Sequence, residues 1–160
     1  ELPPRFGAGH GSLRPSNILL VRPQGRAIDA HLVDYGLQGI RASMGTMTLV
    51  PAIAYMSPED LAGVPGTREG DIFVLGSILY EVITARPAFS GTNALEVGYR
   101  ISSGFRPHLS ETNVPSAQLR DVIEACWLDD AGSRPSMSDL ANMLNNLEAS
   151  DFVRSRHAKA

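Results

Sequence analysis

The chain has 160 residues, of which 43% are apolar and 19% charged, a composition close to the globular average that excludes a disordered or fibrous protein. The formal net charge is −3, so we expect no nucleic-acid binding and no binding to an anionic membrane surface. A single cysteine, Cys126, excludes an internal disulfide and favours a reducing, cytoplasmic compartment.

Two short apolar runs near the start of the chain predict a β-hairpin. The first run covers residues 17–21 and the second residues 27–33, and Pro23 and Gly25 between them favour a turn. Residues 36–56 show no sustained period and predict a long loop, of a length that is usually functional in compact domains.

Helical spacing begins at Thr67. This residue can cap a helix over 67–84, which Pro87 should close. The helix is apolar almost all round, so we expect it to be the most buried element. Further helices are predicted over 93–103, 116–127 and 136–149, with a connecting loop at 104–115 and a frayed tail at 150–160. The expected fold class is mainly α, with one β-hairpin and a helical bundle around a buried central helix.

Short motifs line up in order around these elements. Residues 10–17 read HGSLRPSN before the hairpin, residues 34–36 read DYG after it, and residues 57–59 read SPE at the end of the long loop. This order resembles the C-terminal lobe of the protein kinase superfamily, with its H-R-D-L-x-x-x-N, D-F-G and A-P-E motifs. The likeness continues at 71–76, which resembles D-V-W-S-F-G, and at 126–135, which resembles C-W-x₆-R-P. The competing interpretation is a hairpin and helical bundle with fortuitous matches.

The resemblance implies a site for Mg²⁺ and ATP. Asn17 and Asp34 match the two metal-binding positions and carry the oxygen ligands that Mg²⁺ prefers, and we expect them to face each other across the hairpin mouth. Leu19 matches the side chain under the adenine ring. From the residues alone, Asn17 could equally stabilise a turn, Asp34 could cap a loop, and Leu19 could be a core strand residue.

The catalytic loop departs from the family pattern. Ser12 stands at the position of the catalytic aspartate, and a hydroxyl is too weak a base at neutral pH to replace it. Arg14 stands where Ser/Thr kinases have lysine, and Gly11 and Ala52 replace an arginine and a threonine of the family. The pattern resembles a pseudokinase that acts as a regulatory or docking module. The alternatives are an ATP-dependent Ser/Thr protein kinase with an altered catalytic loop, since positioning and metals supply most of that catalysis, and a kinase-homology domain that regulates an attached enzyme.

Other matches imply structural roles. Glu59 and Arg134 match an ion pair that anchors the end of the activation segment, and we expect them within salt-bridge distance. Asp71 matches the residue that holds the catalytic-loop backbone. His10 and Tyr35 match members of the hydrophobic column that joins the kinase lobes, and Gly36 completes its motif.

The sequence shows no match to the glycine-rich loop or the strand lysine of the nucleotide-binding lobe. We therefore expect residues 1–149 to be a C-terminal lobe that lacks its N-lobe, which the same polypeptide or another chain would supply. ATP and Mg²⁺ would bind only with that N-lobe, and no cofactor is expected for residues 1–160 alone. Protein partners are expected.

Overall fold

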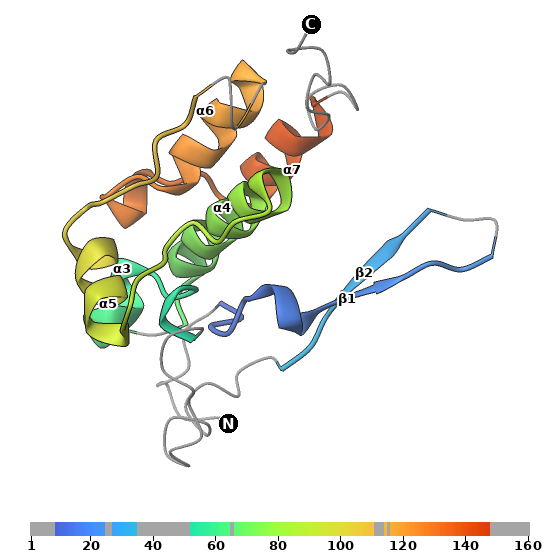
Figure 1. Ribbon diagram of the computed structural model, residues 1–160. Coiled ribbons are helices and arrows are strands. Elements are labelled where there is room, and N and C mark those ends of the chain that lie inside the picture. The colour runs from blue at the N-terminus through green and yellow to red at the C-terminus, as the bar shows by residue number, and fades with distance from the viewer. Residues whose placement is uncertain are drawn as a thin grey trace, which may run out of the picture.

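The computed structural model describes residues 9–24, 27–34, 52–64, 66–110, 114 and 116–147 (Figure 1). Its helices and strands are, in chain order, η1 (Pro15–Asn17), β1 (Ile18–Val21), β2 (Asp29–Leu32), α3 (Pro58–Leu61), α4 (Arg68–Thr84), α5 (Ala94–Ser102), α6 (Ala117–Cys126), η2 (Ala131–Ser133) and α7 (Met137–Asn145). Tyr35, Gly36, the tail 150–160 and the predicted loop up to residue 51 lie outside the described residues.

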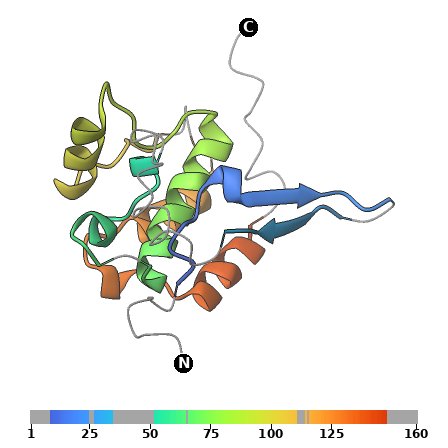
Figure 2. The same cartoon turned by 90° about the horizontal axis from the view of Figure 1, so that it is seen from below.

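Helix α4 runs through the middle of the helical part, with α6 and α7 along one side and the hairpin on the other (Figures 1 and 2). Thr67 caps it by accepting a hydrogen bond from the Gly70 backbone N–H at 2.9 Å. Three consecutive side chains, Ile72, Phe73 and Val74, are at most 3% exposed. Because successive helical residues point about 100° apart, neighbours must cover α4 on several sides, as the sequence predicts.

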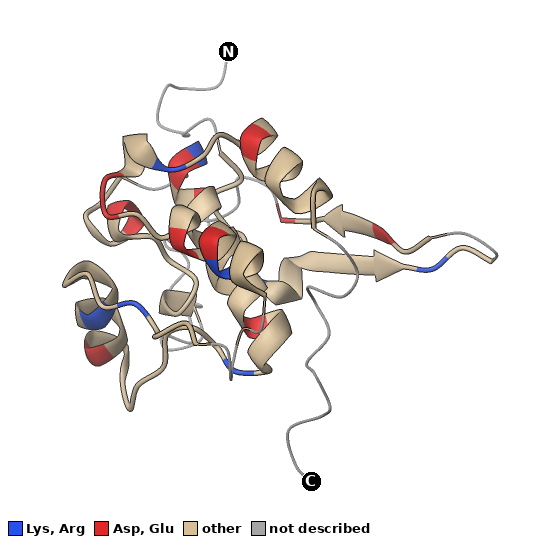
Figure 3. Ribbon diagram, turned by 90° about the horizontal axis from the view of Figure 1, so that it is seen from above, with Lys and Arg blue, Asp and Glu red and all other residues tan. Residues whose placement is uncertain are grey.

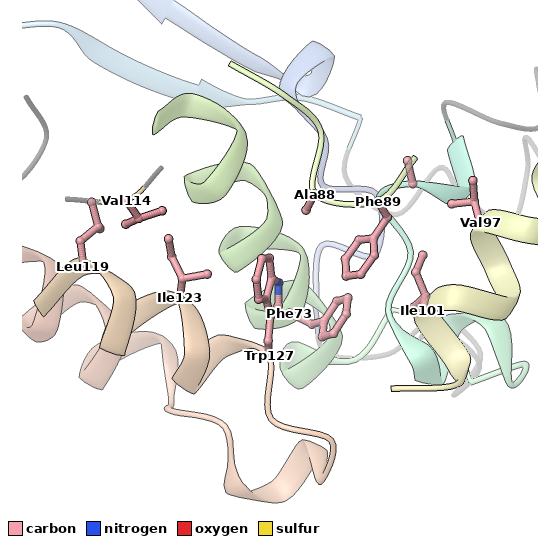
Figure 4. Packing of buried hydrophobic residues seen from close by; sticks show 10 residues of the cluster. Phe73, Ala88, Phe89, Val97, Ile101, Val114, Leu119, Ile123 and Trp127 are labelled. Carbon is pink, nitrogen blue, oxygen red and sulfur yellow. The ribbon is translucent and has the colours of Figure 1, made fainter. Parts of the chain in front are cut away.

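The main core forms where α4 meets α5 and α6. Phe73 stacks on Phe89 with ring centroids 5.7 Å apart, and Trp127 lies 5.9 Å from Phe89. The indole Nε1 of Trp127 donates to the Ser77 hydroxyl at 3.2 Å, which satisfies its polar edge in the interior. Figure 4 shows these aromatic side chains between residues of α5 and residues of α6. Trp127 is thus a core residue.

The predicted hairpin is confirmed, with an antiparallel register that pairs Ile18 with Leu32 and Val21 with Asp29. It projects away from the helices (Figures 1 and 2). Leu19 is 50% exposed, so its interpretation as a core residue is wrong. Leu20 and Val21 are exposed too, so both faces of β1 are open to solvent. In the described part of the chain the sheet has two strands, and neither a helix nor a third strand covers β1 at Leu19.

Helix α4 ends at Thr84, as predicted, and is followed by Ala85 in the left-handed conformation at φ 54°. Pro87 lies three residues beyond this end, where a proline prevents the helix from continuing. Two other features differ from the prediction. Helix α7 ends at Asn145, where Asn146 is the C-cap, and does not continue to residue 149. The short helix α3 was not predicted. Its N-cap Ser57 and Asp60 form a capping box, which stabilises a single turn.

The remaining helices begin where the sequence predicts. The side chains of Asn93, Ser116 and Ser136 each accept a hydrogen bond from the backbone N–H three residues later, which caps α5, α6 and α7. In the ranges that the structure describes, we find no helix with the length and apolarity required to cross a bilayer.

Candidate functional site

Asp71, in the first turn of α4, fixes the loop before the hairpin. Its Oδ1 accepts a hydrogen bond from the Gly11 backbone N–H at 2.9 Å, and its Oδ2 accepts one from the His10 backbone N–H. Burial raises the pKa of Asp71, and the two backbone donors lower it by less, so the net shift is upward. The predicted contact between the central helix and the loop backbone is confirmed.

The two glycines of this loop have conformational reasons to be there. Gly11 has φ +68°, a region that glycine enters without the steric cost of a Cβ atom. A Cβ on Gly9 would lie 2.5 Å from the Asp71 Oδ2 and the Thr67 carbonyl, so the backbone here packs directly against α4. His10 between them is 6% exposed, which agrees with the structural role expected for it.

Ser12 follows, with its side chain beside Asn17. The Asn17 Nδ2 donates to the Ser12 backbone carbonyl at 2.8 Å and lies 3.4 Å from the Ser12 Oγ. Asn17 is 2% exposed, so it is held inside the loop that it stabilises. Hydrogen bonds to Asp71 and Asn17 therefore fix the backbone of this loop, and the side chain at the family's catalytic position is a neutral hydroxyl.

Arg14 lies on the other side of the same amide. Its Nε is 3.4 Å from the Asn17 Oδ1, and the Ser16 hydroxyl lies 3.5 Å from that oxygen. Sequence reasoning missed this contact. The residue types gave no signal for it, because the direction of a long arginine side chain depends on the charges around it.

Asp34 stands just beyond the second strand. The Val33 backbone N–H donates to the Asn17 carbonyl at 3.0 Å, so the main chain brings Asp34 near Asn17, while the facing of the two side chains stays a prediction. Asp34 has φ +65°, a conformation that Asp tolerates better than most non-glycine residues. Ala52 is half-buried, and its carbonyl accepts the Tyr55 N–H at 3.3 Å.

The predicted Glu59–Arg134 pair is confirmed. The Arg134 Nη2 lies 2.7 Å from one Glu59 carboxylate oxygen, and Nη1 lies 3.2 Å from the other. Arg134 also donates to the carbonyls of Leu128 and Glu69, both at 2.9 Å. Its guanidinium carbon lies 5.1 Å from the centre of the Phe73 ring, a cation–π geometry. The pair thus joins the start of α3, the start of α4 and the loop after α6.

Two further polar residues, Tyr55 and Arg106, make contacts between distant segments of the helical part that were not predicted. The Tyr55 hydroxyl donates to the Glu81 carboxylate, and burial, followed by the effect of Glu81, raises the pKa of Tyr55 above its ordinary range. Arg106 lies 4.8 Å from the centre of the Phe73 ring on α4 and donates to the Trp127 carbonyl at 3.0 Å. These contacts join residues that are distant in sequence, so no local sequence pattern predicts them.

The arrangement can hold a loop and a hairpin in fixed positions, but its chemistry differs from that of the family's site. Ser12 offers no carboxylate to accept a proton, and the Asn17 oxygen faces a guanidinium. Across the ranges the structure describes, no group of three or more His, Cys, Asp or Glu residues is placed to hold a metal ion. Asparagine is not among these residue types, so the magnesium site expected at Asn17 and Asp34 stays a prediction.

The comparisons with known proteins agree on one family. The profile of the family described as "Protein kinase domain" matches residues 6–144. "Serine/threonine-protein kinase PkaA" of Streptomyces coelicolor is 37% identical, over 86% of this chain and 25% of the relative, and "Serine/threonine-protein kinase AfsK" of the same organism is 36% identical, over 86% and 17%. "Putative serine/threonine-protein kinase/receptor R818" of Acanthamoeba polyphaga mimivirus is 30% identical, over 86% and 8%. The chain spans a quarter or less of the length of these relatives.

Proposed function

Because this chain belongs to the protein kinase domain family, we propose that it is a kinase lobe with impaired phosphotransfer, a pseudokinase lobe that acts as a regulatory or docking module for a protein partner. The observation that carries the proposal is the state of one loop. Its backbone is held by Asp71 and its interior by Asn17, while the side chain at the position of the family's proton acceptor is Ser12.

The size of the chemical loss supports the proposal. A positioned general base contributes about 10²–10⁴-fold to a rate, and Ser12 cannot supply that contribution at neutral pH. The neighbouring departures at Gly11 and Ala52 remove two further groups that the family uses to arrange the same region. Phosphotransfer by this lobe, when it is joined to a nucleotide-binding half, is therefore expected to be weak or absent.

The surface supports a role in binding protein. Leu95 and Tyr99 stand one helical turn apart on α5 and are 83% and 72% exposed, which places two large apolar groups side by side in solvent. In the described part of the chain, basic segments are scattered among acidic ones (Figure 3), which suits a protein partner better than the phosphate backbone of a nucleic acid. An intracellular location belongs to the same proposal.

The second candidate is an ATP-dependent Ser/Thr protein kinase with an altered loop. The observation in its favour is Asp34, which remains at the end of the hairpin in the left-handed conformation. The relatives are themselves named serine/threonine kinases, and positioning and metal ions supply much of phosphoryl transfer.

One assay separates the two candidates. The polypeptide that carries this lobe with its nucleotide-binding half is incubated with γ-labelled ATP, Mg²⁺ and Ser/Thr peptides, beside the variants Asp34→Ala and Asp29→Ala. Asp29 lies in the same hairpin and is exposed, so its variant is a matched control. The proposal expects all three proteins to transfer labelled phosphate to the peptides only at the background level. Transfer by the wild type and Asp29→Ala that is lost in Asp34→Ala would establish the kinase instead.

A further inference from the structure

Both ends of the Asn17 side-chain amide are engaged within its own loop. Its Nδ2 lies 2.8 Å from the Ser12 backbone carbonyl. A carbonyl can only accept a hydrogen bond, so this contact decides which end of the amide is nitrogen and rules out the flipped orientation. The Oδ1 must therefore face the opposite way. Since Asn17 is 2% exposed, the amide is held in this orientation by packing as well.

The Oδ1 faces a permanent positive charge. The Arg14 Nε lies 3.4 Å from it, and a guanidinium keeps its proton at any physiological pH. A magnesium ion binds its oxygen ligands at about 2.1 Å, so an ion on this oxygen would lie within about 5.5 Å of Nε. At that separation the two cations repel each other, and the burial of Asn17 reduces the screening of this repulsion by solvent.

The loop also lacks the negative charge that would draw Arg14 elsewhere. The side chain nearest to the Asn17 amide nitrogen in this loop is the neutral hydroxyl of Ser12, whose Oγ lies 3.4 Å from Nδ2. A carboxylate at this position would pair with the guanidinium. With a hydroxyl there, the amide oxygen becomes the acceptor.

We propose that the Arg14 guanidinium occupies the space beside the Asn17 Oδ1 in which a divalent ion would bind. Asn17 then fixes the loop and does not coordinate a divalent ion. The inference concerns the same loop as the proposed function and rests on the same loss at Ser12, but it is a statement about ion binding. The family's metal position at Asn17 is replaced by an internal guanidinium–amide contact.

The test uses Mn²⁺ as a paramagnetic probe ion and the full chain labelled with ¹⁵N. Broadening of the Asn17 side-chain amide signal is followed during the titration, with the exposed Asn93 amide on α5 as internal reference. In the wild type, the two signals should broaden at similar Mn²⁺ concentrations. In Arg14→Gln, which keeps the length and removes the charge, Asn17 should broaden at a concentration at least about tenfold lower, because the repulsion is gone. Arg22→Gln, an equal charge change at an exposed position of the hairpin, should behave as wild type.

Selective broadening of Asn17 in the wild type would overturn the inference, and this measurement decides the question even if Arg14→Gln fails to fold. Equal behaviour of a folded Arg14→Gln and the wild type would overturn it as well. The two proposals can fail separately. Phosphotransfer with an unbroadened Asn17 would refute the proposed function alone, and Mn²⁺ bound at Asn17 without phosphotransfer would refute this inference alone.

Discussion

Arg134 binds Glu59 through two hydrogen bonds, although the two residues are 75 positions apart in the sequence. The Arg134 side chain has no exposed area and the Glu59 side chain keeps 21%. The contact joins α3 to the loop that precedes α7, and it adds to the packing of Leu61 against the main core in holding α3.

Replacing Glu59 should lower the free energy of unfolding and should make that free energy fall less as the pH becomes acidic. Burial is the largest single effect and raises the pKa of Glu59, but the hydrogen bonds from Arg134, the backbone and Ser57 and the charge of Arg134 together lower it by more, so the net pKa lies below its ordinary value. A lowered pKa in the folded state stabilises the fold above the unfolded pKa of about 4.3, and this contribution is lost as the pH falls through the folded pKa. Glu59→Gln should cost about 1–3 kcal/mol at pH 7, because it weakens the partner of a buried charge.

Urea unfolding followed by circular dichroism at pH 7 and at pH 3.5 would measure this difference. The gap between wild type and Glu59→Gln should narrow at the lower pH. Glu124→Gln, at an exposed position of α6, serves as control. A gap of the same size at both pH values would contradict the prediction.

A methyl group at Gly76 should destabilise the core. Its Cβ would lie 2.6 Å from the Cys126 Cβ and 3.2 Å from the Trp127 Nε1, so α4 and α6 would have to move apart. Gly76→Ala should cost about 1–3 kcal/mol. Gly98→Ala on α5 is the matched control, since its Cβ would meet Ile53 and Leu61 at an ordinary 3.8 Å. That variant should gain about 1 kcal/mol from helix propensity. Thermal melts that place both variants on the same side of wild type would refute this account.

Gly11 should tolerate asparagine better than alanine. At φ +68°, Gly11→Ala places a Cβ in the left-handed region, at a cost of about 1–2 kcal/mol. Asparagine enters this region more readily, so Gly11→Asn should cost less. Gly132→Ala in η2, whose Cβ would lie 3.8 Å from the Asp130 carboxylate, should be close to neutral. Chemical unfolding that ranks alanine and asparagine equally would show that the backbone conformation does not limit this position.

Cys126 should be inert in the folded chain. It is fully buried, and burial raises the pKa of its thiol to about 12, so almost no thiolate exists near neutral pH. Ellman's reagent at pH 8 should leave the native protein unmodified and should titrate one thiol after unfolding in urea. Rapid modification of the native chain would show that the packing between α4 and α6 opens readily.

Restoring a carboxylate should raise phosphotransfer. In the polypeptide that contains both kinase halves, Ser12→Asp should increase the rate of peptide phosphorylation by up to about 10²-fold, the low end for a general base, because Gly11 and Ala52 are unchanged. The new carboxylate should also draw Arg14 away from Asn17. Ser102→Asp adds the same charge at an exposed position of α5 and should have no effect. Equal rates in the two variants would show that Ser12 is not the limiting loss.

Local signals in the sequence predicted the helices well. The start of α4 follows from the cap at Thr67, and the cap at Ser136 likewise marks the start of α7. The end of α7 was misplaced because Leu147 continues the apolar spacing beyond the last helical residue, and spacing alone cannot show that the helix has stopped. Helix α3 was missed because a single turn is too short to display a period.

The site was predictable only where the family resemblance supplied distant partners. Glu59 and Arg134 could be paired only by matching motifs, since no local pattern links residues so far apart. The core position, which was the alternative interpretation of Leu19 from the residues alone, is wrong because a two-stranded ribbon leaves this side chain half exposed, while its match to the adenine position stays a prediction. The contact of Arg14 with Asn17 depends on which way a flexible side chain turns, and the residue types alone do not show this.

Asp71 accepts hydrogen bonds from peptide N–H groups, which every residue except proline possesses. At Ser12, the anchor of this loop therefore does not depend on the identity of the side chain. Under the proposed function, serine at this position removes the proton acceptor and leaves the loop in place, because backbone atoms fix the loop and side-chain atoms perform the chemistry.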